Sequence, residues 1–291
     1  MGIPDFRTGT APDVDYAEDE RIARSLAATE TSASFAAMLD AFTRMRPAVS
    51  AGAQRSQAAH FEAEREQAET ALDRLGEGAA YLDLGCGAGR YLQAATGRFA
   101  TVVGVDASLA QLVLARKLLR EGGVEATLAA AEVERLPFAD ATFDAVTATD
   151  LIEHLADPEA AVSEAGRVTS EGGRLFLTAP NRYSLTPEPH VGVWGLGFLP
   201  RERAEALVAR RFGIDYRHIR PPSLERFRTI LSCFPGEVRV ETPAPGPREI
   251  ATFGAGKRLA ARAYLWLRGS RALGGLVERV APYFQGWGVK R

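Results

Sequence analysis

The spacing of hydrophobic and polar positions divides the chain into stretches of different character. Residues 1–14 show no periodicity, and we expect them to form a disordered leader. Across residues 16–75 the hydrophobic positions recur at helical spacing, among strong helix formers. This spacing predicts three helices, over 16–28, 33–45 and 54–75.

From residue 79 the pattern changes to short apolar runs that alternate with amphipathic stretches. The apolar runs predict strands over 79–84, 100–106, 124–131, 142–149, 172–180 and 237–242. The amphipathic stretches predict helices over 108–123, 158–169 and 223–234. Strands and helices that alternate at this spacing form a parallel sheet covered on both faces, so the chain belongs to the α/β class.

The alternation stops after Pro180. Residues 181–222 are long, aromatic and rich in glycine and proline, and residues 246–280 are again helical. We expect both to be insertions over the mouth of a substrate site, with a last strand at the end of the chain. The domains predicted are a leader and helical cap (1–75), a catalytic domain (76–245) with a lid at 181–222, and a helical insertion with the final strand (246–291).

Composition and charge set limits on the cellular context. The 46% hydrophobic and 25% charged residues are typical of a globular protein with a sizeable core. Cys86 and Cys233 lie far apart, which favours a reducing, cytoplasmic setting. The acidic N-terminus is not a signal peptide, and no stretch approaches the ~20 apolar residues of a membrane span.

Basic residues gather in the last third of the chain. Residues 181–291 carry 19 basic and 9 acidic side chains, although the whole chain has a net charge of −2. This excess is compatible with an anionic substrate, a nucleic acid or a membrane surface. An ordinary solvated face rich in arginine explains it equally well.

The segment Asp83-Leu-Gly-Cys-Gly-Ala-Gly-Arg90 follows the first strand and precedes a helix. Glycines let a backbone turn tightly and let a ligand approach closely. Seventeen residues after Gly89 the second strand ends on Asp106, where a carboxylate can accept hydrogen bonds from ribose hydroxyls. A nicotinamide site requires a different glycine spacing, and a pyrophosphate would be repelled by Asp83. A ligand with an ammonium and a sulfonium would be attracted, which favours S-adenosylmethionine.

Residues 79–180 resemble class I S-adenosylmethionine-dependent methyltransferases, through YLDLGCGAGR, VVGVDAS, AAEVERLPFADATFDAV, DLIEHLADPEAAVSEAGRV and GGRLFLTAPN. The resemblance implies a doubly wound, mainly parallel seven-stranded sheet of the Rossmann-like methyltransferase type. Glu132 stands where the family usually has an aspartate that touches the adenine amino group. The cofactor-binding residues implied are Asp83, Gly85, Cys86, Gly87, Gly89, Asp106, Ala107, Glu132, Val133 and Thr149. Cys86 is also read as a small residue packed beneath the glycine turn, and Cys233 as a core residue.

The residues after the fourth strand are candidates for acceptor chemistry. If that turn is helical, Asp150, Glu153 and His154 share one face. The segment resembles ubiquinone-biosynthesis O-methyltransferases and small-RNA 2′-O-methyltransferases. In the latter group such residues and a later histidine, here His190, hold a divalent ion such as Mg²⁺. His154 acting as a direct base, and Glu153 merely capping a turn, are the alternatives.

Other features leave the acceptor open. The aromatic residues of 181–222 suit a lid over a flat or sugar-like ring, and 257–280 suits either an interfacial membrane helix or ordinary packing. His218 is expected at the surface, and His60 lies on a helix face that the sequence does not assign.

The function predicted is O-methylation of a small molecule such as a phenol, quinone precursor or sugar. N- or C-methylation, RNA modification and a non-catalytic binding protein are the competing hypotheses. No RNA-binding module is recognisable, so a nucleic-acid partner is not expected. The oligomeric state is left open.

Overall fold

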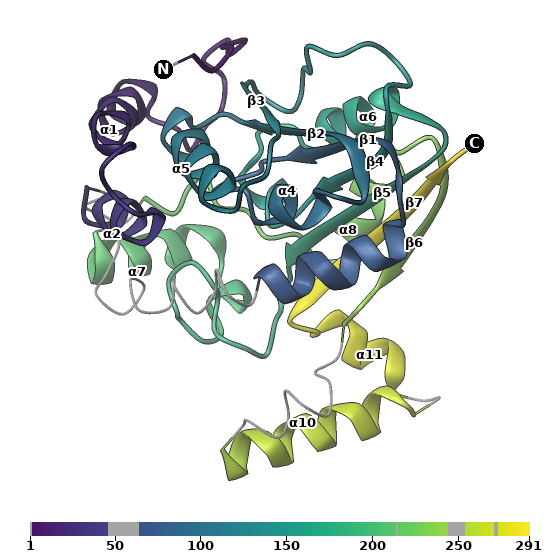
Figure 1. Cartoon of the computed structure of the whole chain (residues 1–291). Coiled ribbons are helices and arrows are strands. Elements are labelled where there is room, and N and C mark those ends of the chain that lie inside the picture. Colours follow the sequence, from purple (N-terminus) through teal and green to yellow (C-terminus); the bar gives the residue numbers. More distant parts are fainter. Residues whose placement is uncertain (1, 46–63, 214, 244–253, 271–272) are drawn as a thin grey trace.

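A seven-stranded sheet forms the centre of the molecule (Figure 1). The computed structural model describes residues 2–45, 64–213, 215–243, 254–270 and 273–291. The strands lie in the order β3-β2-β1-β4-β5-β7-β6; β1 to β5 are parallel, and β7 runs antiparallel to both of its neighbours. The fold class predicted from the sequence is thus confirmed. The strands are β1 (Gly78–Leu84), β2 (Phe99–Asp106), β3 (Thr127–Ala130), β4 (Phe143–Ala148), β5 (Thr169–Pro180), β6 (Gly236–Glu241) and β7 (Tyr283–Lys290).

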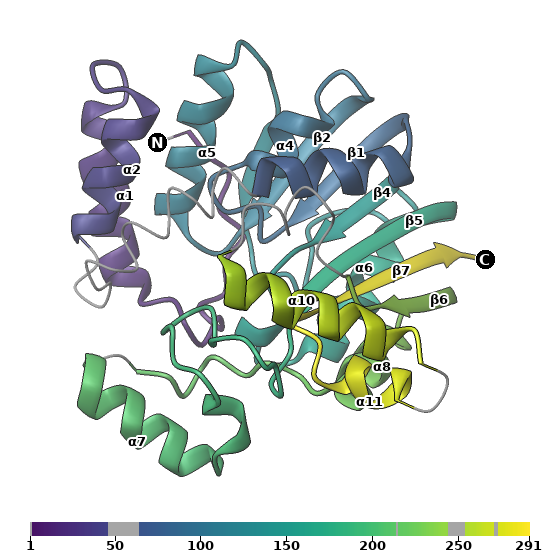
Figure 2. The same ribbon diagram turned by 90° about the horizontal axis from the view of Figure 1, so that it is seen from below.

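Both faces of the sheet are buried, as a parallel sheet requires. Side chains alternate along β1, so Tyr81 enters one hydrophobic core and Leu82 the other. The first core is covered by α4 (Arg90–Ala95), α5 (Leu109–Glu121) and a helix over 64–75. The second is covered by α6 (Pro158–Val168) and α8 (Leu224–Leu231). Figure 2 shows the two layers on either side of the strands.

The N-terminal helices extend the first layer. α1 (Tyr16–Thr29) and α2 (Phe35–Met45) contribute buried residues to the same core as α5. Local signals explain where the helices begin: Ser108 accepts a hydrogen bond from the Gln111 amide at the start of α5, and Asp157 does the same for Ala160 in α6. The predicted helix bounds therefore agree closely with those observed. Residues 46–63, including the start of the predicted helix 54–75 and His60, lie outside the described residues.

The prediction of a disordered leader is wrong. Residues 4–6 lie beside the end of β3, where the amide of Phe6 donates to the carbonyl of Ala130 and the amide of Ala130 donates to the carbonyl of Pro4 (2.7 and 2.9 Å). The leader lacks a periodic pattern because backbone hydrogen bonds and one apolar residue, Ile3, attach it to the domain.

Two insertions follow the fifth strand. Residues 181–222 contain η2 (Leu196–Phe198) and α7 (Arg201–Phe212), around a small core of Leu196, Ala204, Val208 and Tyr216. The glycines and prolines of this region concealed α7 in the sequence. α10 (Ala255–Arg268) and α11 (Gly274–Arg279) project below the sheet (Figures 1 and 2). Among the described helices, none has the length and apolarity needed to cross a membrane.

Candidate active site

Three glycines turn the chain between β1 and α4. Gly85, Gly87 and Gly89 all have positive φ angles, of 65°, 49° and 89°. A Cβ built at Gly85 would meet the side chain of Leu151 at 2.7 Å, and one at Gly89 would meet Ala115 at 3.1 Å. At Gly87 no atom lies within 4 Å of that position. Two glycines therefore allow close packing, whereas Gly87 faces open space that a ligand can enter.

Asp106 ends β2 beside this loop. Its carboxylate accepts hydrogen bonds from the amides of Gly87 (2.9 Å) and Ser108 (2.8 Å). Burial raises the pKa of Asp106 to about 6, although the two amide hydrogen bonds oppose that shift. The geometry brings together the loop and the acid that the sequence predicted to act together.

Negative charge gathers around the loop. Asp83 is buried and accepts a hydrogen bond from the Thr147 hydroxyl (2.6 Å). Burial, together with the nearby Glu64 and Asp106 carboxylates, raises the pKa of Asp83 well above its usual range. Burial and the charge of Asp150 likewise raise the pKa of Glu64 to about 7. So much acidity in a buried site favours a cationic ligand such as a sulfonium with an ammonium group. Sequence reasoning missed Glu64, since it lies on a helix outside the motif.

The remaining predicted cofactor residues have different positions. The amide of Cys86 donates to the Val105 carbonyl (3.0 Å) and its buried thiol belongs to the core, so this residue shapes the turn. Its second predicted role, as a small packed residue, is the one that the structure supports. The carbonyl of Ala107 accepts from Arg7 (3.1 Å). Val133 is buried and lies just beyond β3, and Thr149 is partly buried and lies just beyond β4, at the same edge of the sheet.

Glu132 is occupied by the N-terminus of the chain. Its carboxylate accepts hydrogen bonds from the amides of Thr8, Gly9 and Thr10 and from the Tyr16 hydroxyl, at 2.8, 2.8, 3.2 and 2.6 Å. Burial would raise the pKa of Glu132, but these hydrogen bonds more than offset it and hold the pKa at about 2. The carboxylate therefore meets protein donors where an adenine contact was expected.

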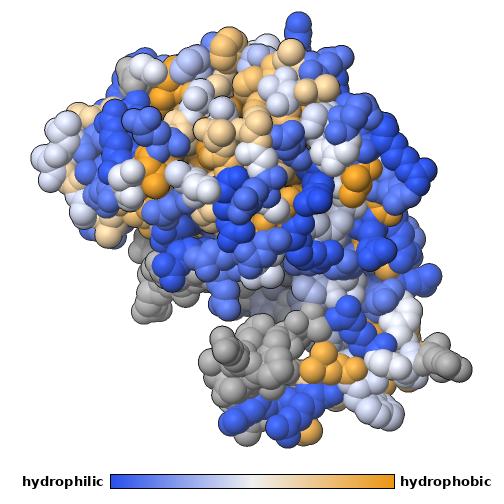
Figure 3. Space-filling model, turned by 45° about the vertical axis from the view of Figure 1, so that its right-hand side comes forward, coloured by the Kyte–Doolittle hydropathy of each residue, from blue (hydrophilic) through white to orange (hydrophobic). Residues whose placement is uncertain are grey.

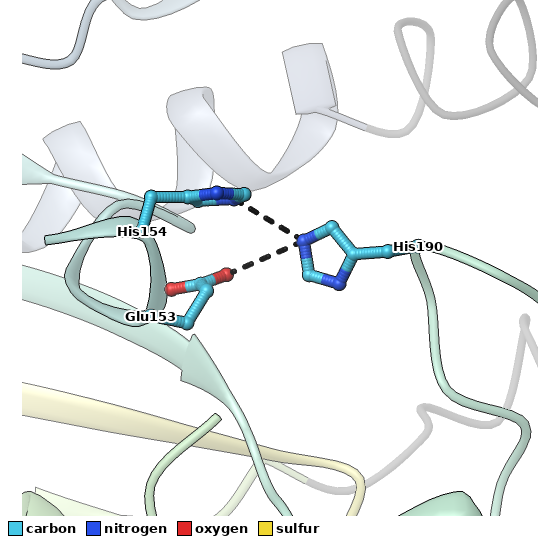
Figure 4. Close-up of side chains that lie close together, drawn as sticks. All are labelled: Glu153, His154 and His190. Atoms are coloured by element: carbon cyan, nitrogen blue, oxygen red, sulfur yellow. Dashed lines mark hydrogen bonds and ion pairs between the residues drawn. The ribbon is translucent and has the colours of Figure 1, made fainter. Parts of the chain in front are cut away.

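Glu153, His154 and His190 meet in space (Figure 4). Glu153 and His154 belong to η1 (Ile152–His154), and His190 reaches them from the insertion. The Nε2 atoms of the two histidines lie 3.2 Å apart, and His190 Nε2 lies 3.9 Å from a carboxylate oxygen of Glu153. Sequence reasoning predicted all three residues, and the fold brings them together from positions 36 residues apart.

Each histidine has a carboxylate at its other ring nitrogen. His154 Nδ1 lies 3.1 Å from Asp13, and His190 Nδ1 lies 2.5 Å from Glu188. The Glu188 hydrogen bond holds a proton on His190 Nδ1 and leaves His190 Nε2 with its lone pair. Asp13 meets His154 Nδ1 as an ion-pair contact that is not aligned as a hydrogen bond, and its charge favours a proton on that nitrogen. The lone pair of His190 faces His154 Nε2 at 3.2 Å, a separation that suits a proton or a cation between the two nitrogens.

Glu153 adds a buried negative charge to this pair. The side chain is fully buried, and among the described residues neither carboxylate oxygen has a hydrogen-bond partner. Burial raises the pKa of Glu153 to about 8, although the charge of His154 opposes the shift. Burying a carboxylate without a partner is costly, so the site favours an added cation or proton.

The structure does not bring Asp150 into this cluster. Its backbone is left-handed (φ 49°), and its carboxylate accepts a hydrogen bond from Thr178 on β5 (3.0 Å). The turn is a short 3₁₀ helix that begins after Asp150, so the helical spacing assumed in the sequence does not occur. Among the described residues, the group with ligand atoms within 4.8 Å of one another consists of Glu153, His154 and His190.

Other candidates lie away from the cluster. His218 lies 3.9 Å from Asp215 and is partly exposed, as expected. Cys233, expected in the core, is only partly buried. In the insertion, the side chains of Trp194 and Phe198 are 68% and 52% exposed, so they do not close over a pocket in this structure. Their exposed apolar area remains available to a ligand or partner.

The segment that contains the glycine loop and strands β2 to β4 is similar to known methyltransferases. Residues 82–177 match the sequence model of a methyltransferase domain. A ubiquinone biosynthesis O-methyltransferase from Idiomarina loihiensis is 32% identical over 146 residues, which cover 50% of this chain and 57% of that protein. A ubiquinone biosynthesis O-methyltransferase from Alkalilimnicola ehrlichii is 38% identical over 107 residues, which cover 36% of this chain and 43% of that protein. The chain thus spans about half the length of the curated relatives it matches.

Solved structures share the fold. A S-adenosylmethionine-dependent methyltransferase from Mesorhizobium loti has a TM-score of 0.56 at 16% identity, covering 79% of this chain and 100% of that one. Phosphoethanolamine N-methyltransferase 2 of Haemonchus contortus, in complex with S-adenosyl-L-methionine, has a TM-score of 0.51 at 19% identity. That match covers 77% of this chain and 52% of that one. The [4+2]-cyclase SpnF has a TM-score of 0.52 at 22% identity, and the match covers 79% of this chain and 81% of that one. Because these names describe different activities, the likeness shows the fold alone.

Proposed function

We propose that this chain, whose sheet and glycine loop form a class I S-adenosylmethionine-dependent methyltransferase domain, methylates a hydroxyl oxygen of a small molecule. The observation that carries the choice of oxygen is the cluster of Glu153, His154 and His190 at the carboxyl end of β4. A nitrogen nucleophile with a free lone pair needs no such cluster, whereas a hydroxyl must lose its proton. The named activity of the two curated relatives supports the same choice.

Methyl transfer is a direct displacement. A lone pair of the acceptor oxygen attacks the methyl carbon, the carbon–sulfur bond breaks, and S-adenosylhomocysteine leaves with the bonding electron pair. The protein mainly aligns the reacting atoms and excludes water. In this chain Asp106 and the open space at Gly87 would hold the cofactor, and the two imidazoles would receive the acceptor proton.

The donor set also fits a divalent cation. Glu153, His154 and His190 would hold it, with Asp13 and Glu188 behind the two imidazoles as outer partners. Two imidazole nitrogens and one carboxylate suit Mn²⁺, Fe²⁺, Co²⁺ or Zn²⁺ better than the Mg²⁺ expected from the sequence. When bound, such an ion supplies positive charge that lowers the pKa of a nearby hydroxyl.

The test is a transfer assay with the full chain. We expect methyl ether formation when radiolabelled S-adenosylmethionine is incubated with a panel of phenols, catechols and sugars, and none with matched amines. Chelation by EDTA, followed by return of Mn²⁺ or Zn²⁺, then separates a cation from a metal-free histidine base. Methyl groups found on nitrogen, on carbon or on transfer RNA would contradict the proposal.

We also propose that α10 rests on an anionic membrane surface. Leu259 and Trp266, seven positions apart on one helix face, are 72% and 76% exposed, and the exposed Arg258 and Arg262 lie on the same helix. Figure 3 shows apolar and polar surface side by side on the lower lobe that α10 and α11 form. Exposed aromatic and basic side chains together suit the boundary between lipid headgroups and acyl chains.

Vesicle sedimentation tests this second proposal. We expect the chain to sediment with vesicles that contain phosphatidylglycerol and not with pure phosphatidylcholine, and Trp266→Glu to prevent it. Leu207→Glu, at an exposed leucine on α7, is the matched control and should change nothing. Equal sedimentation of the wild type and Trp266→Glu would contradict membrane contact through α10. A cytoplasmic location, expected from two cysteines that are both free, stays a prediction.

A further inference from the structure

The start of the chain forms a strap, residues 4–16, along the carboxyl edge of the sheet. It pairs with β3 at Ala130, and the Arg7 guanidinium then donates to the carbonyl of Ala107, which directly follows Asp106. It ends where Asp15 caps α1 by accepting from the Glu18 amide. The strap is thus attached at both ends and lies next to the predicted ribose-binding acid.

Glu132 is the central anchor of the strap. Three consecutive amides, of Thr8, Gly9 and Thr10, converge on its carboxylate, and the Tyr16 hydroxyl completes the set. Gly9 has a φ of 83°, a left-handed conformation that lets successive amides point at one anion. Four strap residues would lose this partner together if the Glu132 carboxylate were removed or neutralised.

The far part of the strap reaches the acceptor cluster. Asp13, three residues beyond Thr10, places a carboxylate oxygen 3.1 Å from His154 Nδ1, an ion-pair contact that is not aligned as a hydrogen bond. Glu132 follows β3 and His154 follows β4, and β2 and β1 lie between those strands. The strap therefore crosses the edge where the cofactor loop lies and joins the two sites.

We propose that Glu132 anchors the strap and that Asp13, carried by the strap, is a positioning residue that turns His154 Nε2 toward His190. This inference rests on the proposed function for the role of His154, but not for the contact itself. Glu188 plays the same part for His190 from within the insertion, where its carboxylate also accepts from the His190 and Val191 amides. The acceptor site is then complete only while the strap is docked.

The experiment observes the imidazole directly, without turnover. The chain has four histidines, so ring ¹⁵N signals can be assigned with single His→Gln variants. In the protein without cofactor, His154 is expected to carry its proton on Nδ1, and Asp13→Ala is expected to shift it to a mixture of tautomers. Asp13→Glu should restore the Nδ1 form in part. A wild-type His154 protonated on Nε2, or one unchanged by Asp13→Ala, would overturn the role of Asp13.

Glu132→Gln tests the anchor from a distance. We expect amide hydrogen exchange at residues 8–10 to quicken at least tenfold and the His154 ring signals to move as they do in Asp13→Ala. Glu125→Gln, an exposed acid just before β3, is the matched control. If residues 8–10 keep their protection, or if they lose it while His154 stays unchanged, the strap does not build the site. Because no readout uses methyl transfer, failure here is distinct from failure of the proposed function.

Discussion

The cofactor edge and the acceptor cluster are built in different ways. The cofactor edge lies within one strand–loop–helix–strand unit, residues 78–106, where Gly87 and Asp106 are 19 positions apart and joined by a hydrogen bond. The acceptor cluster draws Asp13, His154 and Glu188 with His190 from three separate segments. Its geometry depends on how the strap and the insertion dock against the turn after β4.

This difference predicts how each region responds to damage. A local unit keeps its shape as long as the loop and its two strands are intact. An assembled cluster loses its geometry when any one segment moves, even if the sheet is unaffected. A substitution at the cofactor edge should therefore remove one contact to the ligand. Substitutions in the acceptor cluster should have non-additive effects on turnover, because each of them disturbs the same assembly.

The largest effect is expected for Gly87→Val. A valine at a φ of 49° is strained, and its side chain fills the open space that the ligand needs. We expect cofactor binding to be abolished in calorimetric titration while the circular dichroism spectrum stays close to that of the wild type.

Gly123→Val is the matched control for backbone strain. Gly123 also has a positive φ (64°) and open space around its Cβ position, but it follows α5, away from the loop. The Gly123→Val variant should lose stability and keep its affinity for the cofactor. Normal cofactor binding by Gly87→Val would show that this loop is not the binding site.

The next largest effect is expected for His190→Ala. Loss of a group that removes the acceptor proton typically lowers turnover about 10²–10⁴-fold. Because the cluster works as one unit, His154→Ala and the double variant should be nearly as slow as the single variant. Steady-state rates with the identified acceptor, together with unchanged cofactor affinity, would check this. Full turnover in both single variants would leave alignment alone as the mechanism.

How far the sequence predicts each region follows from the same contrast. The strands, the glycine turn and Asp106 were predictable because local spacing encodes them. Glu153, His154 and His190 were named as candidates, but their meeting depends on the insertion, which has no periodic pattern. Asp13, Glu64 and Glu188 were missed because each is an isolated acid whose role arises only from a neighbour distant in sequence. Asp150 was included because a helix was assumed where a left-handed residue and a 3₁₀ turn stand.

A smaller effect is expected for Asp106→Ala. Removing a charge-assisted acceptor of ribose hydroxyls should weaken cofactor binding by about 1.5–3 kcal/mol. Calorimetric titration measures this, and Asp140→Ala provides the control, because Asp140 is an exposed acid that pairs with Arg167 away from the loop. Unchanged affinity in Asp106→Ala would contradict the role given to the end of β2.

The smallest effect, and the one that most sharply tests the local character of the cofactor edge, is the pH dependence of cofactor affinity. Burial raises the pKa of Asp106 to about 6, and the carboxylate must be ionised to accept from ribose hydroxyls. The contribution of Asp106 to affinity should therefore be present above pH 6 and be lost as pH drops through it, by about tenfold at pH 5, because one proton competes with one ligand contact. Asp106→Asn does not titrate, so its weaker affinity should lack this step. Glu64, whose pKa burial raises to about 7, would add a second step that Glu64→Gln removes. If the step near pH 6 persists in Asp106→Asn, the titrating group lies outside the residue that the local motif predicts, and the cofactor edge is not self-contained.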